Sequence, residues 1–216
     1  MNASFIFTSI CSLTGLLPFI MGLKKRNVIN ETYTLFIWYV AIAFFAEFSG
    51  RILLILKLYD EAKILSNVYV LFEGLLFLLL FYKWNVISKL RVLSIFTVLI
   101  LVWIYENHIY SSLKITNSFY IIIYSIITVL LGIKLFQKEY YNNKNYFFRD
   151  PFGIISATLI ITYSYRAVFE SLYLVKLELS NNFYFSAFFI FIILNVFSNC
   201  TFTYAIHYMS LKRRLF

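Results

Sequence analysis

Long apolar runs dominate the chain, and short polar segments separate them. A helix needs about 20 mostly apolar residues to cross a bilayer, and the runs reach that length repeatedly. The pattern therefore predicts an all-α fold, in which seven transmembrane helices form one bundle and one domain over residues 1–216. The predicted spans cover residues 4–23, 32–56, 64–82, 92–106, 115–135, 152–175 and 183–209.

The two prolines refine this picture at the first and sixth spans. Pro18 predicts a kink in the first span, because proline lacks the backbone N–H that a helix interior needs. Pro151 suits the first turn of the sixth span, where that N–H would have no helical partner.

Composition supports a membrane protein. The chain is 62% hydrophobic and only 13% charged, whereas a soluble domain is about a quarter charged, and its mean hydropathy is +0.80. His108 and His207 are the only histidines, and they belong to opposite ends of the predicted bundle. We therefore predict neither a metal site nor another cofactor.

Charge predicts the orientation. Basic residues follow the odd-numbered spans, whereas the other loops hold Asp60, Glu61, Glu106 and Glu178. Cytoplasmic loops collect Lys and Arg, so we expect the N-terminus outside and the C-terminus in the cytoplasm. The same rule explains the net charge of +9, and nucleic acid is not expected as a partner.

A basic cytoplasmic face follows from this orientation. Its members are Lys24, Lys25, Arg26, Lys138, Lys144, Arg149, Arg213 and Arg214. Such a face contacts membrane lipids. The loop 137–150, which reads QKEYYNNKNYFFRD, is the best candidate for docking a soluble protein. No GxxxG motif marks a helix dimer, and a homo-oligomer stays open.

Ionisable and amide side chains inside the spans are the candidate site. Such groups are costly in a bilayer and usually face the bundle interior. In the predicted orientation they share one level, in the outer half of the bundle. The candidates are Glu47, Arg51, Asn67, Tyr69, Glu73, Tyr163, Arg166, Glu170, Asn195 and Asn199.

Spacing predicts two ion pairs within this cluster. Glu47 and Arg51 lie four residues apart in one span, as do Arg166 and Glu170 in another, so each pair shares a helix face. Glu73 has no partner in its own span. It is either protonated or shared with one of the two arginines. The cluster is then either a polar clamp that fixes helix register or a pocket that opens outward.

The sequence lacks the residues that most kinds of catalysis need. The seventh span has no lysine for a Schiff base, and no Gly-rich phosphate loop or evident nucleophile occurs. An acid–base site that uses only Glu47, Glu73 and Glu170 stays possible.

The positions of several motif residues resemble one family. They are Pro18, Gly22 and Lys24, then Glu47, then Asn67, Tyr69, Glu73, Phe81 and Tyr82, then Pro151 and Phe152, and finally Asn195. The pattern resembles a large bacterial family of small multi-pass membrane proteins, which includes the membrane accessory proteins of type VI-B CRISPR systems. Gly153 departs from the aromatic residue expected after Pro-Phe.

The resemblance implies a non-enzymatic accessory, sensor or regulatory role in bacterial defence or signalling, in the inner membrane. The alternative is a membrane-embedded enzyme, a lipid- or small-molecule-binding protein or a transporter that uses the same cluster. A cluster closed by Glu–Arg contacts, with no cavity, favours the first reading.

Overall fold

The computed structural model of the chain describes residues 3–142, 149–175 and 180–209. These residues form helices joined by short turns, and no strand occurs among them. In chain order the elements are α1 (Ala3–Ser12), the 3₁₀ turn η1 (Leu13–Gly15), α2 (Leu16–Lys25), α3 (Glu31–Ile55), α4 (Tyr59–Lys83), α5 (Lys89–Tyr105), the π-helical turn η2 (Glu106–Tyr110), α6 (Ser118–Asn142), α7 (Pro151–Val175) and α8 (Asn181–Tyr208).

The described part of the chain contains seven helical segments that are long and apolar enough to cross a membrane. They are Phe7–Lys25, Glu31–Ile55, Tyr59–Lys83, Lys89–Tyr110, Ser118–Tyr141, Pro151–Val175 and Asn182–Tyr208. The predicted seven-helix bundle is therefore confirmed. The fourth segment differs most in length from its prediction over residues 92–106. It begins at Lys89, and η2 extends it to Tyr110, which gives 22 residues.

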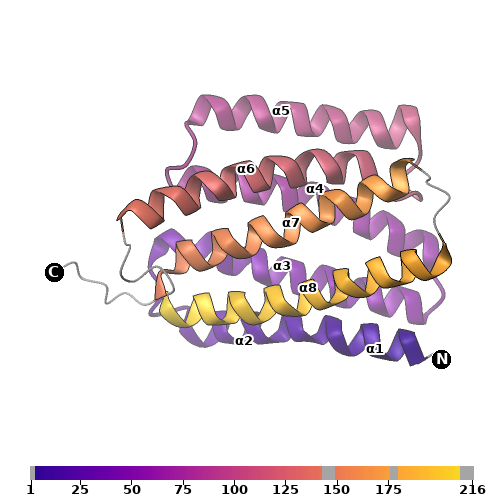
Figure 1. Cartoon of the computed structure of the whole chain (residues 1–216), viewed down its shortest axis with the longest axis horizontal. Helices are drawn as coiled ribbons and strands as arrows, with labels where there is room; N and C mark the ends of the chain where they lie inside the picture. The colour runs from indigo at the N-terminus through magenta and orange to yellow at the C-terminus, as the bar shows by residue number, and fades with distance from the viewer. Residues whose placement is uncertain (1–2, 143–148, 176–179, 210–216) are drawn as a thin grey trace.

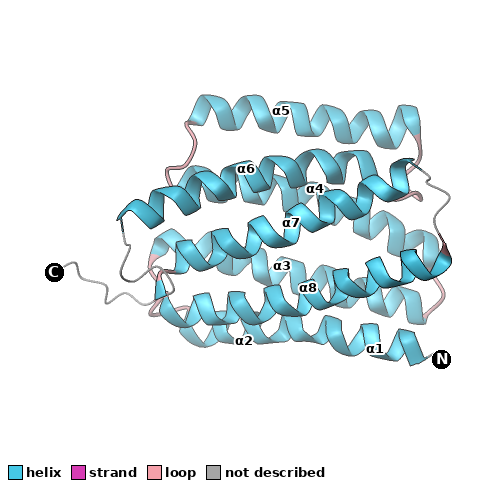
Figure 2. Ribbon diagram, viewed as in Figure 1, coloured by secondary structure: helices cyan, strands magenta, loops and turns pink. Residues whose placement is uncertain are grey.

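The helices lie side by side, and consecutive long helices run in opposite directions (Figure 1, Figure 2). The closest packing joins α6 to α7, α7 to α8, and α3 to α4, while α2 lies along α8. Helix α5 is at the edge of the bundle and packs on α4 and α6. Apolar side chains point outward around this bundle: Leu93, Leu101, Leu130 and Phe185 are each at least 60% exposed. Such a surface suits lipid and not water.

The two prolines lie next to a helix interruption and at a helix start. The first membrane-length segment is interrupted at η1, one turn before Pro18, where the proline ring removes a helical hydrogen bond and clashes with the preceding turn. Pro151 opens α7, and the Asp150 carboxylate accepts a 2.9 Å hydrogen bond from the backbone N–H of Gly153. Asp150 therefore caps the helix.

The members of the predicted basic face that the structure describes lie at one end of the bundle, where α2, α4, α6 and α8 end (left in Figure 1). There Lys25 Nζ donates to the carbonyl of His207 at 2.5 Å, and Lys138 Nζ donates to the carbonyl of Trp84 at 3.1 Å. These ammonium groups satisfy carbonyls at the C-terminal ends of α8 and α4. Lys144, Arg213, Arg214 and part of the loop 137–150 fall outside the described residues.

The opposite end has mixed charge. Lys114 and Asp60 form an exposed ion pair at 2.7 Å. The hydrogen bond to Asp60, followed by the charge of that carboxylate, raises the pKa of Lys114. Both side chains are about 60% exposed, so the pair contributes little to stability.

Candidate functional site

Glu73, in the middle of α4, is the centre of the polar cluster. Its Oε1 accepts hydrogen bonds from the hydroxyls of Tyr69 and Tyr163, both at 2.9 Å. Its Oε2 accepts from the hydroxyl of Tyr124 at 2.5 Å and from Nη1 of Arg166 at 2.7 Å. A carboxylate offers about four acceptor sites. Four donors therefore occupy the acceptor sites of Glu73.

Arg166, on α7, is held by this carboxylate and by two aromatic rings. Its guanidinium carbon lies 5.4 Å from the ring centre of Tyr124 and 5.7 Å from that of Tyr163, which gives cation–π contacts. Among the described residues, Nε and Nη2 of Arg166 have no hydrogen-bond partner, and neither atom is fully buried. Its side chain keeps 16% exposure. Part of the guanidinium is therefore free to meet a ligand.

The two ion pairs that spacing predicted do not form. Arg51 donates instead to Thr8 on α1, to the hydroxyl at 3.2 Å and to the carbonyl at 3.4 Å. Glu47 accepts from Nδ2 of Asn195 at 3.4 Å, a long contact. Long side chains reach neighbouring helices as easily as the next turn of their own. The prediction that Glu73 shares an arginine is confirmed, and the arginine is Arg166.

The predicted ion pair of Glu170 with Arg166 is replaced by a different contact. Its Oε2 accepts a 2.7 Å hydrogen bond from the hydroxyl of Ser118, at the start of α6. It forms no ion pair with Arg166, and it does not line the cavity described next. Arg166 turns away from it because Glu73 offers a buried oxygen within reach.

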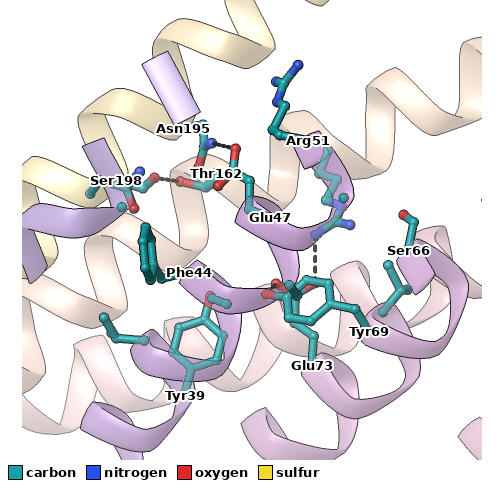
Figure 3. Close-up of a pocket in the computed structure, with 18 of the residues that line it drawn as sticks. Tyr39, Phe44, Glu47, Arg51, Ser66, Tyr69, Glu73, Thr162, Asn195 and Ser198 are labelled. Carbon is teal, nitrogen blue, oxygen red and sulfur yellow. Dashed lines mark hydrogen bonds and ion pairs between the residues drawn. The ribbon is translucent and has the colours of Figure 1, made fainter. Parts of the chain in front are cut away.

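A cavity of about 360 Å³ lies beside Glu73, between α3, α4, α7 and α8 (Figure 3). Its walls carry four charged residues: Glu47 and Arg51 from α3, Glu73 from α4, and Arg166 from α7. Figure 3 shows Glu47 pointing toward Asn195, while Glu73 and Tyr69 lie on the opposite wall. Most of the predicted cluster therefore faces one shared space.

The cavity runs from an exposed part of its lining to a buried part, and both parts mix polar and apolar side chains. Ser66, an exposed residue near the start of α4, lines it together with Arg51 and Leu54 from the end of α3. The buried side chains of Tyr39 and Phe202 line the other part. The mouth is thus at the end of the bundle opposite the basic face.

Two of the predicted amides have local structural roles. Asn67 is buried, and its Nδ2 donates to the carbonyls of Leu113 at 2.9 Å and Ile115 at 2.6 Å. It holds the turn before α6 and does not line the cavity. Asn199 lines the cavity, and its Nδ2 donates to the hydroxyl of Thr14 at 2.9 Å.

Sequence reasoning missed Tyr124, which comes from α6 and donates to Glu73. The signal for it was slight: Tyr120 and Tyr124 stand four apart in an otherwise aliphatic run. It also missed Thr162, whose hydroxyl lies 2.6 Å from that of Ser198 on the cavity wall. Small hydroxyls in a span carry no distinct pattern.

Glu106, which the sequence places in a loop, has a structural role at the start of α6. Its carboxylate accepts from the backbone N–H groups of Phe119 at 2.9 Å and Tyr120 at 2.7 Å. It therefore satisfies free N–H groups at the start of α6 and ties the end of the fourth segment to that helix.

The side chains around the cavity are better suited to binding and orienting a ligand than to transferring protons. Glu73 has no free lone pair for a substrate proton, because four donors occupy its acceptor sites. No group of three or more His, Cys, Asp and Glu side chains that could hold a metal occurs in residues 3–142, 149–175 and 180–209. Open polar groups in the described lining include the free N–H groups of Arg166, Nε of Arg51 and the second oxygen of Glu47.

Comparison of the chain with models of known protein families, with curated proteins and with solved structures finds no match. The family resemblance of the motif pattern therefore stays a prediction.

Proposed function

We propose that this chain is a multi-pass membrane protein that binds a small polar molecule in the cavity and acts as a non-enzymatic sensor or accessory protein. The cavity of about 360 Å³ lined by charged residues supports this most directly. Its volume falls in the range of small-molecule sites, about 300–1,000 Å³. A clamp closed by Glu–Arg pairs would have left no such space.

The two ends of the bundle suit a receptor-like arrangement. If the basic face is cytoplasmic, as the distribution of Lys and Arg predicts, the cavity mouth at Ser66 opens to the outside. A ligand then enters from outside, while lipids or a soluble protein meet the basic face. The bacterial inner membrane as the location, and a part in defence or signalling, are proposals that rest on the motif resemblance alone.

Thiol labelling tests this proposal. Thr162 lines the cavity halfway along α7, and Thr162→Cys is a small change. In a Cys11→Ser, Cys200→Ser background we expect a charged, membrane-impermeant methanethiosulfonate to modify this cysteine from the outer side. Thr97→Cys on the exposed face of α5 is the control. It should not react, because thiolate formation in lipid is disfavoured.

A second variant tests whether the labelling reagent enters through the mouth of the cavity. Gly50 lines the cavity, and a Cβ added there would meet no atom within 4 Å. Gly50→Phe should fill the mouth and block labelling of Thr162→Cys, while Gly50→Ala should not. A folded Thr162→Cys protein that never reacts would show a sealed cluster, and the binding proposal would be wrong.

A further inference from the structure

We propose that the cavity binds a zwitterion, in which a primary ammonium and a carboxylate or phosphodiester lie a few bonds apart. The anionic group meets Arg166, and the ammonium meets Glu47. This inference rests on the proposed function, because it names the ligand class for the same cavity.

The charge of the cavity favours a ligand without net charge. Two arginines and two glutamates line it, so its formal charge is zero. A lone anion or cation would add an uncompensated charge to a site of low dielectric, which is costly. A zwitterion leaves the balance unchanged and gives each of its charges a partner.

The open hydrogen-bonding groups place the two ends of the ligand. Arg166 has free N–H groups on Nε and Nη2 within the described structure, and guanidinium groups bind carboxylates and phosphates well. Glu73 cannot accept an ammonium, because four donors already occupy it. Glu47 can, since its single partner is Asn195 at 3.4 Å. Arg166 on α7 and Glu47 on α3 therefore bind opposite ends of one molecule.

The remaining lining suits a small head with a short apolar part. Ser66, Thr162 and Asn195 add hydroxyl and amide groups, whereas Val40 and Phe202 are apolar. A free amino acid-like molecule and the headgroup of an ethanolamine phospholipid both have this chemistry. The structure shows the shared chemistry, and the experiment separates the two sources.

The test measures protection of the cavity thiol. Purified Thr162→Cys protein, in the same Cys11→Ser, Cys200→Ser background, is labelled in neutral detergent with β-alanine or glycerophosphoethanolamine present. A probe at about ten times its dissociation constant should slow labelling about tenfold. Ethanolamine and propionate, which each carry one of the two charges, should leave the rate unchanged. For the lipid source, nanodiscs of phosphatidylethanolamine are compared with nanodiscs of phosphatidylcholine, whose quaternary ammonium has no N–H donor.

Variants assign the ammonium contact. Glu47→Gln should remove the protection while the cysteine stays reactive. Glu170→Gln is the matched control, because Glu170 is a partly buried carboxylate outside the cavity, and it should leave protection intact.

Each outcome of these measurements either supports or contradicts the zwitterion inference. Protection by the soluble zwitterions assigns a free ligand, and protection by phosphatidylethanolamine alone assigns a lipid headgroup. If the thiol reacts but no zwitterion protects it, or if ethanolamine or propionate protects equally well, the zwitterion inference is wrong while the binding cavity stands. If the thiol does not react at all, both proposals are wrong.

Discussion

Arg166 Nη1 lies 2.7 Å from Glu73 Oε2, a contact between α7 and α4 that joins residues 93 positions apart. The arginine bypasses Glu170, which is one turn away on its own helix. The pair therefore fixes two helices to each other and leaves the cavity side of the guanidinium open.

Loss of one partner of this pair should be costly. Arg166→Ala leaves the Glu73 carboxylate buried with no compensating cation, and breaking a buried pair in this way typically costs about 3–5 kcal/mol. Arg166→Ala combined with Glu73→Gln removes both charges and should regain part of that loss. Unfolding in mixed micelles of rising denaturing-detergent content measures the free energy of unfolding for each variant.

Glu170→Gln is the control for this prediction, since it weakens only the hydrogen bond from Ser118 and should cost about 1 kcal/mol. Equal stability of Arg166→Ala and the double variant would show that water, and not the ion pair, compensates the charges.

Two glycines should respond in opposite ways to the same substitution. Gly50→Ala adds a Cβ in open space and should stabilise α3 by up to about 1 kcal/mol, the helix propensity difference. In Gly74→Ala the Cβ would lie 2.6 Å from the Tyr120 hydroxyl, and overpacking typically costs about 1–3 kcal/mol. Thermal unfolding of both proteins checks this. A stabilised Gly74→Ala would mean that Tyr120 moves aside freely.

Asn67 should control the order of the turn that precedes α6. Asn67→Ala strands the carbonyls of Leu113 and Ile115, and an unsatisfied buried polar group costs about 1–3 kcal/mol. Faster hydrogen exchange over residues 111–117 is the expected readout. Ser66→Ala, at the exposed neighbouring position, is the control and should leave that exchange unchanged. Unchanged exchange in Asn67→Ala would show that other contacts hold the turn.

Orientation can be tested at the two ends of the bundle. Ser88 and Ser112 are both exposed, in the connections on either side of the fourth segment. In the cysteine-free background, Ser112→Cys should react with an impermeant reagent on intact cells, and Ser88→Cys should react only after the membrane is opened. The reverse result would place the basic face outside.

The spans and the level of the polar cluster could be predicted from sequence, because both depend on one-dimensional patterns. Apolar length identifies Pro151–Val175 as a membrane-length helix, and positions along each span place Glu47, Glu73 and Arg166 at similar depth.

The choice of partners could not be predicted in this way. A carboxylate one turn away and a carboxylate on another helix are equally plausible partners for Arg166 in sequence. Only packing decides, because it sets which oxygen lies within reach. The role of Tyr124 depends on the rotation of α6 about its axis, and the aliphatic surroundings of this residue do not reveal that rotation.

The two walls of the cavity also differ in the lengths of their polar contacts. Short hydrogen bonds to Glu73 link α4, α6 and α7, whereas the polar contacts that Glu47 and Arg51 of α3 make are longer: 3.4 Å from Asn195 to Glu47, and 3.2 and 3.4 Å from Arg51 to Thr8. Beside the cavity, α3 is therefore held mainly by its apolar packing against α4, and not by short polar contacts.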